Sequence, residues 1–107
     1  MAFFELREYQ IKEGQLARWV QFMDETLIPF QVSKGMVIVG SWSIAADNKY
    51  IWIRRFEDEA DKEALYQAAY KNETWEKELL LIVNEMLDRE AGLNVRQMIA
   101  SPRSIIR

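Results

Sequence analysis

The chain has 107 residues, the size of one domain; half of them are hydrophobic and 29% are charged, a balance typical of folded proteins. Fourteen basic and 17 acidic residues give a net charge of −3, so the sequence has no basic excess that would favour a nucleic-acid partner. Without cysteine or histidine, a disulfide framework, Ser-His-Asp catalysis and imidazole-ligated metal or haem are excluded. We therefore expect one domain spanning residues 1–107, with no metal and no cofactor.

The location of the protein in the cell is predicted from the length of its apolar runs and from the residues at its start. No apolar run approaches the roughly 18 residues that a helix needs to span a bilayer. The opening Met1-Ala2-Phe3-Phe4 is followed at once by charged residues, unlike a secretory signal. We expect a cytoplasmic protein with no membrane span.

The first third of the chain predicts a strand followed by a helix. Residues 2–11 are rich in aromatic and aliphatic side chains, which favour a strand. From Leu16 to Leu27, apolar residues recur at helical spacing. We expect this helix to end near Pro29, because the proline ring removes a backbone donor and disfavours helix at the residue before it.

The middle of the chain predicts a hairpin. Residues 36–44 form a β-branched run with the length of a strand, and residues 50–56 are predicted to return beside it. Asp47-Asn48 favours a tight two-residue turn, since both residues tolerate left-handed backbone conformations. Counted from this turn, the expected cross-strand pairs are Ser43 with Trp52, Ser41 with Arg54 and Val39 with Phe56.

The last third predicts a helical region and a final strand. Asp58 is the expected N-cap of a helix, and the acidic residues around it are typical of a helix start rather than of a metal site. A further helical stripe runs from Trp75 to about Leu87, and residues 93–100 form the last predicted strand. The order β-α-β-β-α-β is the ferredoxin-like α+β arrangement, a four-stranded antiparallel sheet with its helices on one face.

Alternation along the strands divides the predicted sheet into two different faces. The aliphatic residues of the first and third strands, such as Leu6 and Ile53, share one face, which we expect to lie beneath the helices together with Gly40 and Trp42. The other face combines aromatic with charged side chains: Glu5, Arg7, Tyr9, Tyr50, Trp52, Arg54 and Phe56.

The aromatic face predicts a partner. Large aromatic side chains on an open sheet would form a contiguous apolar patch, which usually marks an interface or a ligand site. Burying one of them gains roughly 1.5–3 kcal/mol. The burial free energy of four such side chains is therefore similar in size to the total stability of a domain, roughly 5–15 kcal/mol. A second copy related by a two-fold axis is the simplest cover, so we expect a homodimer, with assembly beyond the dimer left open.

Four segments of the chain resemble the NIPSNAP family: residues 5–14 (ELREYQIKEG), 35–41 (GMVIVGS), 50–60 (YIWIRRFEDEA) and 74–76 (TWE). The resemblance implies a dimeric α+β barrel, in which two ferredoxin-like domains pack sheet against sheet. The broader superfamily includes cofactor-free quinol monooxygenases, haem-degrading enzymes, isomerases and binding modules. Its haem-degrading members use a histidine ligand, which this chain does not contain.

The candidate site residues lie on the aromatic face. Arg54 is predicted to point into a cleft, with Arg7 and Glu5 on a neighbouring strand, where a guanidinium among aromatic rings can hold a carboxylate or enolate oxygen. The competing interpretation is an Arg–Glu pair that fills the interior or ties the dimer together.

Aromatic residues extend the same candidate site. Tyr9, Tyr50 and Trp52, with Phe56 beside them, are read either as stacking and hydrogen-bonding walls for a planar ligand or as core residues. Tyr66 and Tyr70 are one helical turn apart, and we interpret them as surface or helix-packing residues rather than as the mouth of a pocket.

The sequence favours a homodimeric small-molecule-binding protein of the NIPSNAP type, with a cleft between sheet and helices for a planar or acidic apolar metabolite. One alternative is a cofactor-free monooxygenase or isomerase acting through substrate enolate chemistry, in which Glu5 would need a pKa raised by burial to act as the base. A second alternative is a purely structural or interaction module. Whether the protein is an enzyme is left open.

Overall fold

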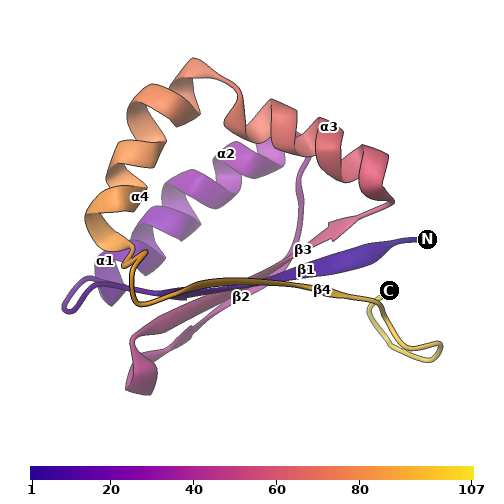
Figure 1. Ribbon diagram of the computed structural model, residues 1–107, viewed down its shortest axis with the longest axis horizontal. Coiled ribbons are helices and arrows are strands. Elements are labelled where there is room, and N and C mark those ends of the chain that lie inside the picture. Colours follow the sequence, from indigo (N-terminus) through magenta and orange to yellow (C-terminus); the bar gives the residue numbers. More distant parts are fainter.

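The computed structural model describes all residues, 1–107, as four strands with the helices gathered on one face of the sheet (Figure 1). The sheet is antiparallel, with spatial order β2-β3-β1-β4. The predicted ferredoxin-like β-α-β-β-α-β arrangement is confirmed. Its strands are β1 (Phe3–Gln10), β2 (Val37–Ile44), β3 (Lys49–Phe56) and β4 (Leu93–Met98).

Two helical stretches cover the sheet (Figure 1). Each one combines α-helix with a turn or more of the wider π-helix, labelled η1 and η3. The first stretch consists of α1 (Leu16–Phe22), η1 (Met23–Leu27) and α2 (Ile28–Ser33), and the second of α3 (Glu59–Tyr70), η3 (Thr74–Leu79) and α4 (Leu80–Met86). None of these helices is both long enough and apolar enough to span a membrane.

The prediction that the first helix ends near Pro29 is wrong. The helix continues through Pro29 to Ser33, with the proline in the first turn of α2. A proline within a continuous helix removes one backbone hydrogen bond, and its ring crowds the carbonyl group four residues before it. The wider π-helical turn of η1 directly before it gives the ring more room beside the preceding carbonyl groups.

The start of α3 follows the prediction. Asp58 is extended and caps the helix, since its Oδ1 accepts a hydrogen bond from the backbone N–H of Asp61 at 2.8 Å. The bond satisfies one of the amide groups that every helix leaves unpaired in its first turn.

The two faces of the sheet are the reverse of the prediction. Tyr9, Tyr50, Trp52 and Phe56 lie beneath the chain's own helices, and none of them is more than 5% exposed. The aliphatic side chains form the outer face instead. The physical reason is the charged pair that shares the aromatic face: buried charges require hydrogen-bond partners, and the helices supply those that the sheet does not, from Gln31, Tyr66 and Tyr70. These aromatic residues are therefore covered within one chain and need no second copy to bury them.

The β2–β3 connection also differs from the prediction. Four residues, 45–48, form the turn instead of two, so Ser43 pairs with Tyr50 and Ser41 pairs with Trp52. A shift of two residues leaves each side chain on its predicted face of the strand pair, because side chains alternate with period two. A β-bulge between Ile38 and Gly40 then changes the alternation.

Two further expectations for β2 are wrong, the first because of the bulge and the second because the faces of the sheet are reversed. Ile38, not Val39, faces the interior, opposite Arg54. Gly40 and Trp42 lie on the outer face rather than under the helices, and Trp42 is 51% exposed. Its indole ring lies directly over Gly40, where an added Cβ would come within 2.7 Å of the ring.

Candidate functional site: a cavity between sheet and helices

Arg54 lies at the centre of a buried hydrogen-bond network. Its Nη1 donates to the Gln31 Oε1 at 2.9 Å and to the Tyr70 hydroxyl at 2.7 Å. Its Nη2 donates to the Glu5 Oε1 at 2.6 Å and to the Tyr66 hydroxyl at 2.8 Å. The guanidinium carbon also lies 4.8–5.8 Å from the centres of four aromatic rings, those of Trp52, Phe56, Tyr66 and Tyr70.

Glu5 is the carboxylate that balances this network. It is directly opposite Arg54 on the neighbouring strand, and it also accepts hydrogen bonds from Arg7 and from the hydroxyl of Tyr66. Burial by itself would raise the pKa of Glu5, but Arg54, Tyr66 and Arg7 outweigh burial and lower that pKa to about 2. At neutral pH Glu5 is therefore a firmly held carboxylate. It lacks the raised pKa that the enolate mechanism requires of it.

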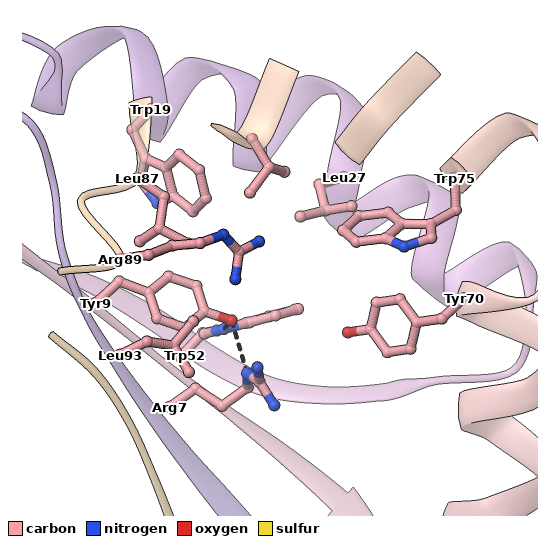
Figure 2. Close-up of a pocket in the computed structure, with 11 residues that line it drawn as sticks. Arg7, Tyr9, Trp19, Leu27, Trp52, Tyr70, Trp75, Leu87, Arg89 and Leu93 are labelled. Atoms are coloured by element: carbon pink, nitrogen blue, oxygen red, sulfur yellow. Dashed lines mark hydrogen bonds between the residues drawn. The ribbon is translucent and has the colours of Figure 1, made fainter. Parts of the chain in front are cut away.

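A cavity of about 170 Å³ lies beside this network, between the sheet and the two helical stretches (Figure 2). Apolar side chains from the helices, from Leu87 just after α4 and from Leu93 at the start of β4 form its walls, and polar side chains from the sheet and from α3 form its floor. The apolar lining is Trp19, Leu27, Trp75, Val83, Leu87 and Leu93, and the remaining lining residues are Arg7, Tyr9, Trp52, Tyr70 and Arg89.

The two π-helical segments both contribute to the cavity wall. Leu27 is the last residue of η1, and Trp75 is the second residue of η3. They approach the cavity from opposite helical stretches, as Figure 2 shows. A π-helical turn inserted in an α-helix is rare and is frequent at functional sites, so its appearance at both walls singles out this cavity.

The cavity floor carries the hydroxyl groups of two tyrosines. The Tyr9 hydroxyl accepts hydrogen bonds from the Arg7 Nε at 2.6 Å and from the Trp52 Nε1 at 3.0 Å. The Tyr70 hydroxyl accepts from Arg54 and, at 2.8 Å, from the Gln31 Nε2. Both hydroxyls point into the space between them (Figure 2). Burial raises the pKa of Tyr9, so its phenol stays protonated at neutral pH.

The charges around the cavity are not balanced. One buried carboxylate, Glu5, faces two guanidinium groups, those of Arg7 and Arg54, and the Lys62 Nζ lies 3.7 Å from the Glu5 Oε2. Arg89 adds a further positive charge at the cavity, pointing into it from the loop before β4 (Figure 2). The site as a whole therefore favours a negatively charged group.

The structure places the seven candidate site residues predicted from the sequence in three different positions relative to the cavity. Three of them, Arg7, Tyr9 and Trp52, line the cavity. Glu5 and Arg54 lie behind its floor, joined to it by hydrogen bonds. Tyr50 and Phe56 are buried on the same sheet face without lining the cavity.

The sequence predicted a cleft between sheet and helices, but not which helical side chains contribute to it. Tyr70 lines the cavity and Tyr66 closes the network behind it, although both were interpreted as surface or packing residues. Their four-residue spacing, which places both hydroxyls on one helix face, was the available signal. Gln31 and Arg89 carry no such signal, because their places depend on where the first helix ends and on how the loop before β4 folds.

The fold and the cavity define the class: a ferredoxin-like α+β domain with an internal cavity between its sheet and its helices. The family model named NIPSNAP matches residues 4–100, nearly the whole chain, and the chain belongs to this family. This confirms the resemblance noted in the sequence.

Solved structures show the same fold. A NIPSNAP family protein from Agrobacterium tumefaciens superposes with a TM-score of 0.88 at 14% identity, covering 100% of both chains. A second protein from that organism, described as a NIPSNAP family protein with unknown function, gives 0.87 at 18% identity, covering 99% of this chain and 94% of its own. A NIPSNAP-like domain protein from Burkholderia xenovorans gives 0.84 at 14% identity, over 96% and 88% of the two chains. No curated protein matches this chain in sequence.

Proposed function

We propose that this protein is a homodimeric small-molecule-binding protein of the NIPSNAP type, which holds a planar or acidic apolar metabolite in the cavity between sheet and helices. The observation that carries the proposal is the lining of that cavity. Apolar walls, aromatic side chains and a few convergent polar groups are the combination that distinguishes small-molecule sites from packing defects.

The size of the cavity supports a small planar ligand. An apolar cavity of about 150 Å³ accommodates a benzene molecule, and this cavity is about 170 Å³. Indole and phenol side chains from both layers, those of Trp19, Trp52, Trp75 and Tyr9, give a flat molecule faces and edges to pack against.

Binding without catalysis is supported better than the enolate mechanism. That mechanism needs a base near neutral pH, whereas Glu5, with its pKa lowered to about 2, is paired with Arg54 and does not line the cavity. No other carboxylate lines the cavity either.

The outer face of the sheet supports the homodimer. It carries exposed or half-exposed apolar side chains across neighbouring strands, among them Trp42, Val37 and Ile53. The segment after β4 lies over one part of this face, where Ile99 and Ile106 line a hollow with Phe4 and Trp42. Sheet-to-sheet contact would bury this patch, which is the kind that a monomer rarely leaves in water.

The dimer is tested by placing a charge on the outer face. We expect Ile53→Arg to convert the dimer to a monomer in analytical ultracentrifugation, because a sheet-to-sheet interface would bury the arginine without a partner. The matched control is Val32→Arg, an exposed apolar residue on α2, which leaves the dimer intact. A wild-type protein that sediments as a monomer at micromolar concentration contradicts the dimer and leaves the cavity proposal untouched.

The ligand is tested by native mass spectrometry of gently purified protein, which we expect to retain a small molecule. Val83→Phe places a ring in the cavity and should abolish that retention. Leu81→Phe, on the exposed side of the same helix, is the control and should keep it. If both variants retain the molecule equally, it binds elsewhere and the proposed site is wrong.

A further inference from the structure

The hydrogen bonds of three tyrosines show which groups at the site are still free to bind. A phenol has one hydrogen to donate and two lone pairs that accept. Tyr66 uses all three: it donates to Glu5 and accepts from Arg54 and Arg7. Its hydroxyl is fully satisfied within the protein.

Tyr9 and Tyr70 differ from Tyr66 in one respect. Each already accepts two hydrogen bonds, Tyr9 from Arg7 and Trp52, and Tyr70 from Arg54 and Gln31. Neither hydroxyl has an acceptor for its own hydrogen. Because nitrogen donors occupy the lone pairs, each hydroxyl can only donate to a ligand.

The remaining polar groups of the cavity are also donors. The Arg7 Nη2 has no hydrogen-bond acceptor in the protein, and a guanidinium can only donate. No side chain that accepts through a carboxylate or amide oxygen lines the cavity. The polar floor therefore has donors without acceptors, and it also has the excess positive charge described above.

We infer that the cavity selects ring-sized organic anions, whose negatively charged oxygen accepts hydrogen bonds from the Tyr9 and Tyr70 hydroxyls beside Arg7. This inference rests on the proposed small-molecule function and deepens it by naming the ligand class. A carboxylate and an enolate or phenolate share this chemistry, since each presents a charged acceptor oxygen next to a planar group. An alcohol or an ammonium brings a hydrogen that finds no acceptor on the floor.

The first test compares three probes that share one ring: benzoate, benzyl alcohol and benzylamine. Binding to wild-type protein is measured by isothermal titration at pH 7 and low salt. We expect benzoate to bind at least about tenfold more tightly than benzyl alcohol, since charge-assisted hydrogen bonds are roughly twice as strong as neutral ones. Benzylamine should show no measurable binding. Phenylacetate and 2-phenylethanol repeat the comparison with a longer arm.

Matched variants assign the selectivity to the free hydroxyls. Tyr70→Phe should weaken benzoate binding by about tenfold or more, the loss expected for one hydrogen bond to a charged group, and should change benzyl alcohol binding by less than about threefold. Tyr66→Phe is the control, since its hydroxyl does not line the cavity, and should leave the preference for benzoate unchanged. Circular dichroism establishes that each variant is folded. If a variant is not folded, the comparison of the three probes on the wild-type protein still tests the inference.

The outcomes separate the inference from the proposed function. Equal affinity for benzoate and benzyl alcohol would overturn the anion selectivity while the cavity remained a ligand site. Selectivity that persists in Tyr70→Phe and in Tyr9→Phe would also overturn the inference, because the discrimination would then come from another group. If the purified protein retains no small molecule and no probe of any charge binds to it, the proposed binding function itself is wrong.

Discussion

Tyr66 and Tyr70 lie one turn apart on α3, yet they belong to different parts of the hydrogen-bond network. We call the part around Tyr66 the closed end, and the part around Tyr70, beside the cavity, the open end. At the closed end, Tyr66, Glu5 and Arg54 hydrogen-bond to one another, and the Tyr66 hydroxyl uses its hydrogen and both lone pairs within the protein. At the open end, Tyr70 and Tyr9 accept all that they can and still hold a free hydrogen beside a cavity. A structural tyrosine is therefore distinguished from a binding one by whether its hydroxyl hydrogen already has an acceptor in the protein, and not by residue type.

The two ends are also connected physically. Arg54 donates through Nη2 to the closed end and through Nη1 to Tyr70 at the open end. A fixed guanidinium therefore sets the position of the Tyr70 oxygen and occupies one of its lone pairs. Arg54 touches no part of the cavity, so its role at the open end is to position Tyr70.

The largest expected effect comes from breaking the closed end. Glu5→Gln removes the charge that balances Arg54 and Arg7, and leaving a buried charge uncompensated costs about 3–5 kcal/mol of unfolding free energy. Urea denaturation followed by tryptophan fluorescence measures this loss.

The matched control is Glu57→Gln. Glu57 pairs with Arg55 at the surface, where a salt bridge contributes at most about 1 kcal/mol. Equal losses in the two variants would mean that the network does not hold the fold together.

Acid should weaken the closed end in a defined pH range. Because the pKa of Glu5 falls from 4.5 unfolded to about 2 folded, its contribution is complete above about pH 4.5 and is lost as the pH falls towards 2. The loss is on the order of 3 kcal/mol. Denaturant midpoints between pH 6 and pH 2 measure it.

The same titration of Glu5→Gln provides the comparison. Its stability should fall less steeply with acid over this range, because the titrating carboxylate is gone. Two parallel curves would show that some other group is responsible for the acid sensitivity.

The two tyrosines of α3 should differ in stability as well as in binding. Tyr66→Phe leaves the buried Glu5 carboxylate without its hydroxyl donor, a cost of about 1–3 kcal/mol. Tyr70→Phe should cost nearer about 1 kcal/mol, because water in the cavity can replace the lost oxygen. Thermal and urea unfolding of both variants test the order, and a larger loss for Tyr70→Phe would reverse the assignment of the two ends.

The smallest expected effect on stability and binding comes from Arg89, the exposed side chain that lines the cavity from the loop before β4. Arg89→Gln changes an exposed side chain, so the unfolding free energy should stay within about 0.5 kcal/mol of wild type. Benzoate should associate more slowly at low salt and at an unchanged rate at high salt, because a peripheral charge steers a ligand mainly through its long-range field. Stopped-flow fluorescence measures the rates. A salt-independent change would place Arg89 in direct contact with the ligand.

The arrangement of elements could be predicted from the sequence because it depends on local patterns. Apolar periodicity located the strands and helices, and Asp58 marked the start of α3. The end of the first helix could not be placed in this way. Proline statistics describe an ordinary α-helix, whereas Pro29 follows a π-helical turn that no local pattern announced.

The two faces of the sheet could not be assigned from the strands alone. Alternation showed that Glu5, Arg54 and Trp52 share a face, and the structure agrees, but it does not say which face the helices cover. The decision depends on long-range partners, since Gln31, Tyr66 and Tyr70 accept hydrogen bonds from the two Nη atoms of the buried guanidinium. The same limit explains why a cleft between sheet and helices was expected near Arg54, but the residues that the helices contribute to it were missed.

A crystal structure of the wild-type protein with benzoate tests the open end most directly. We expect a carboxylate oxygen within about 3 Å of both the Tyr9 and Tyr70 hydroxyl oxygens, with the ring against the apolar wall. A ring that enters with its carboxylate turned away from both hydroxyls, or benzoate bound only outside the cavity, would contradict it.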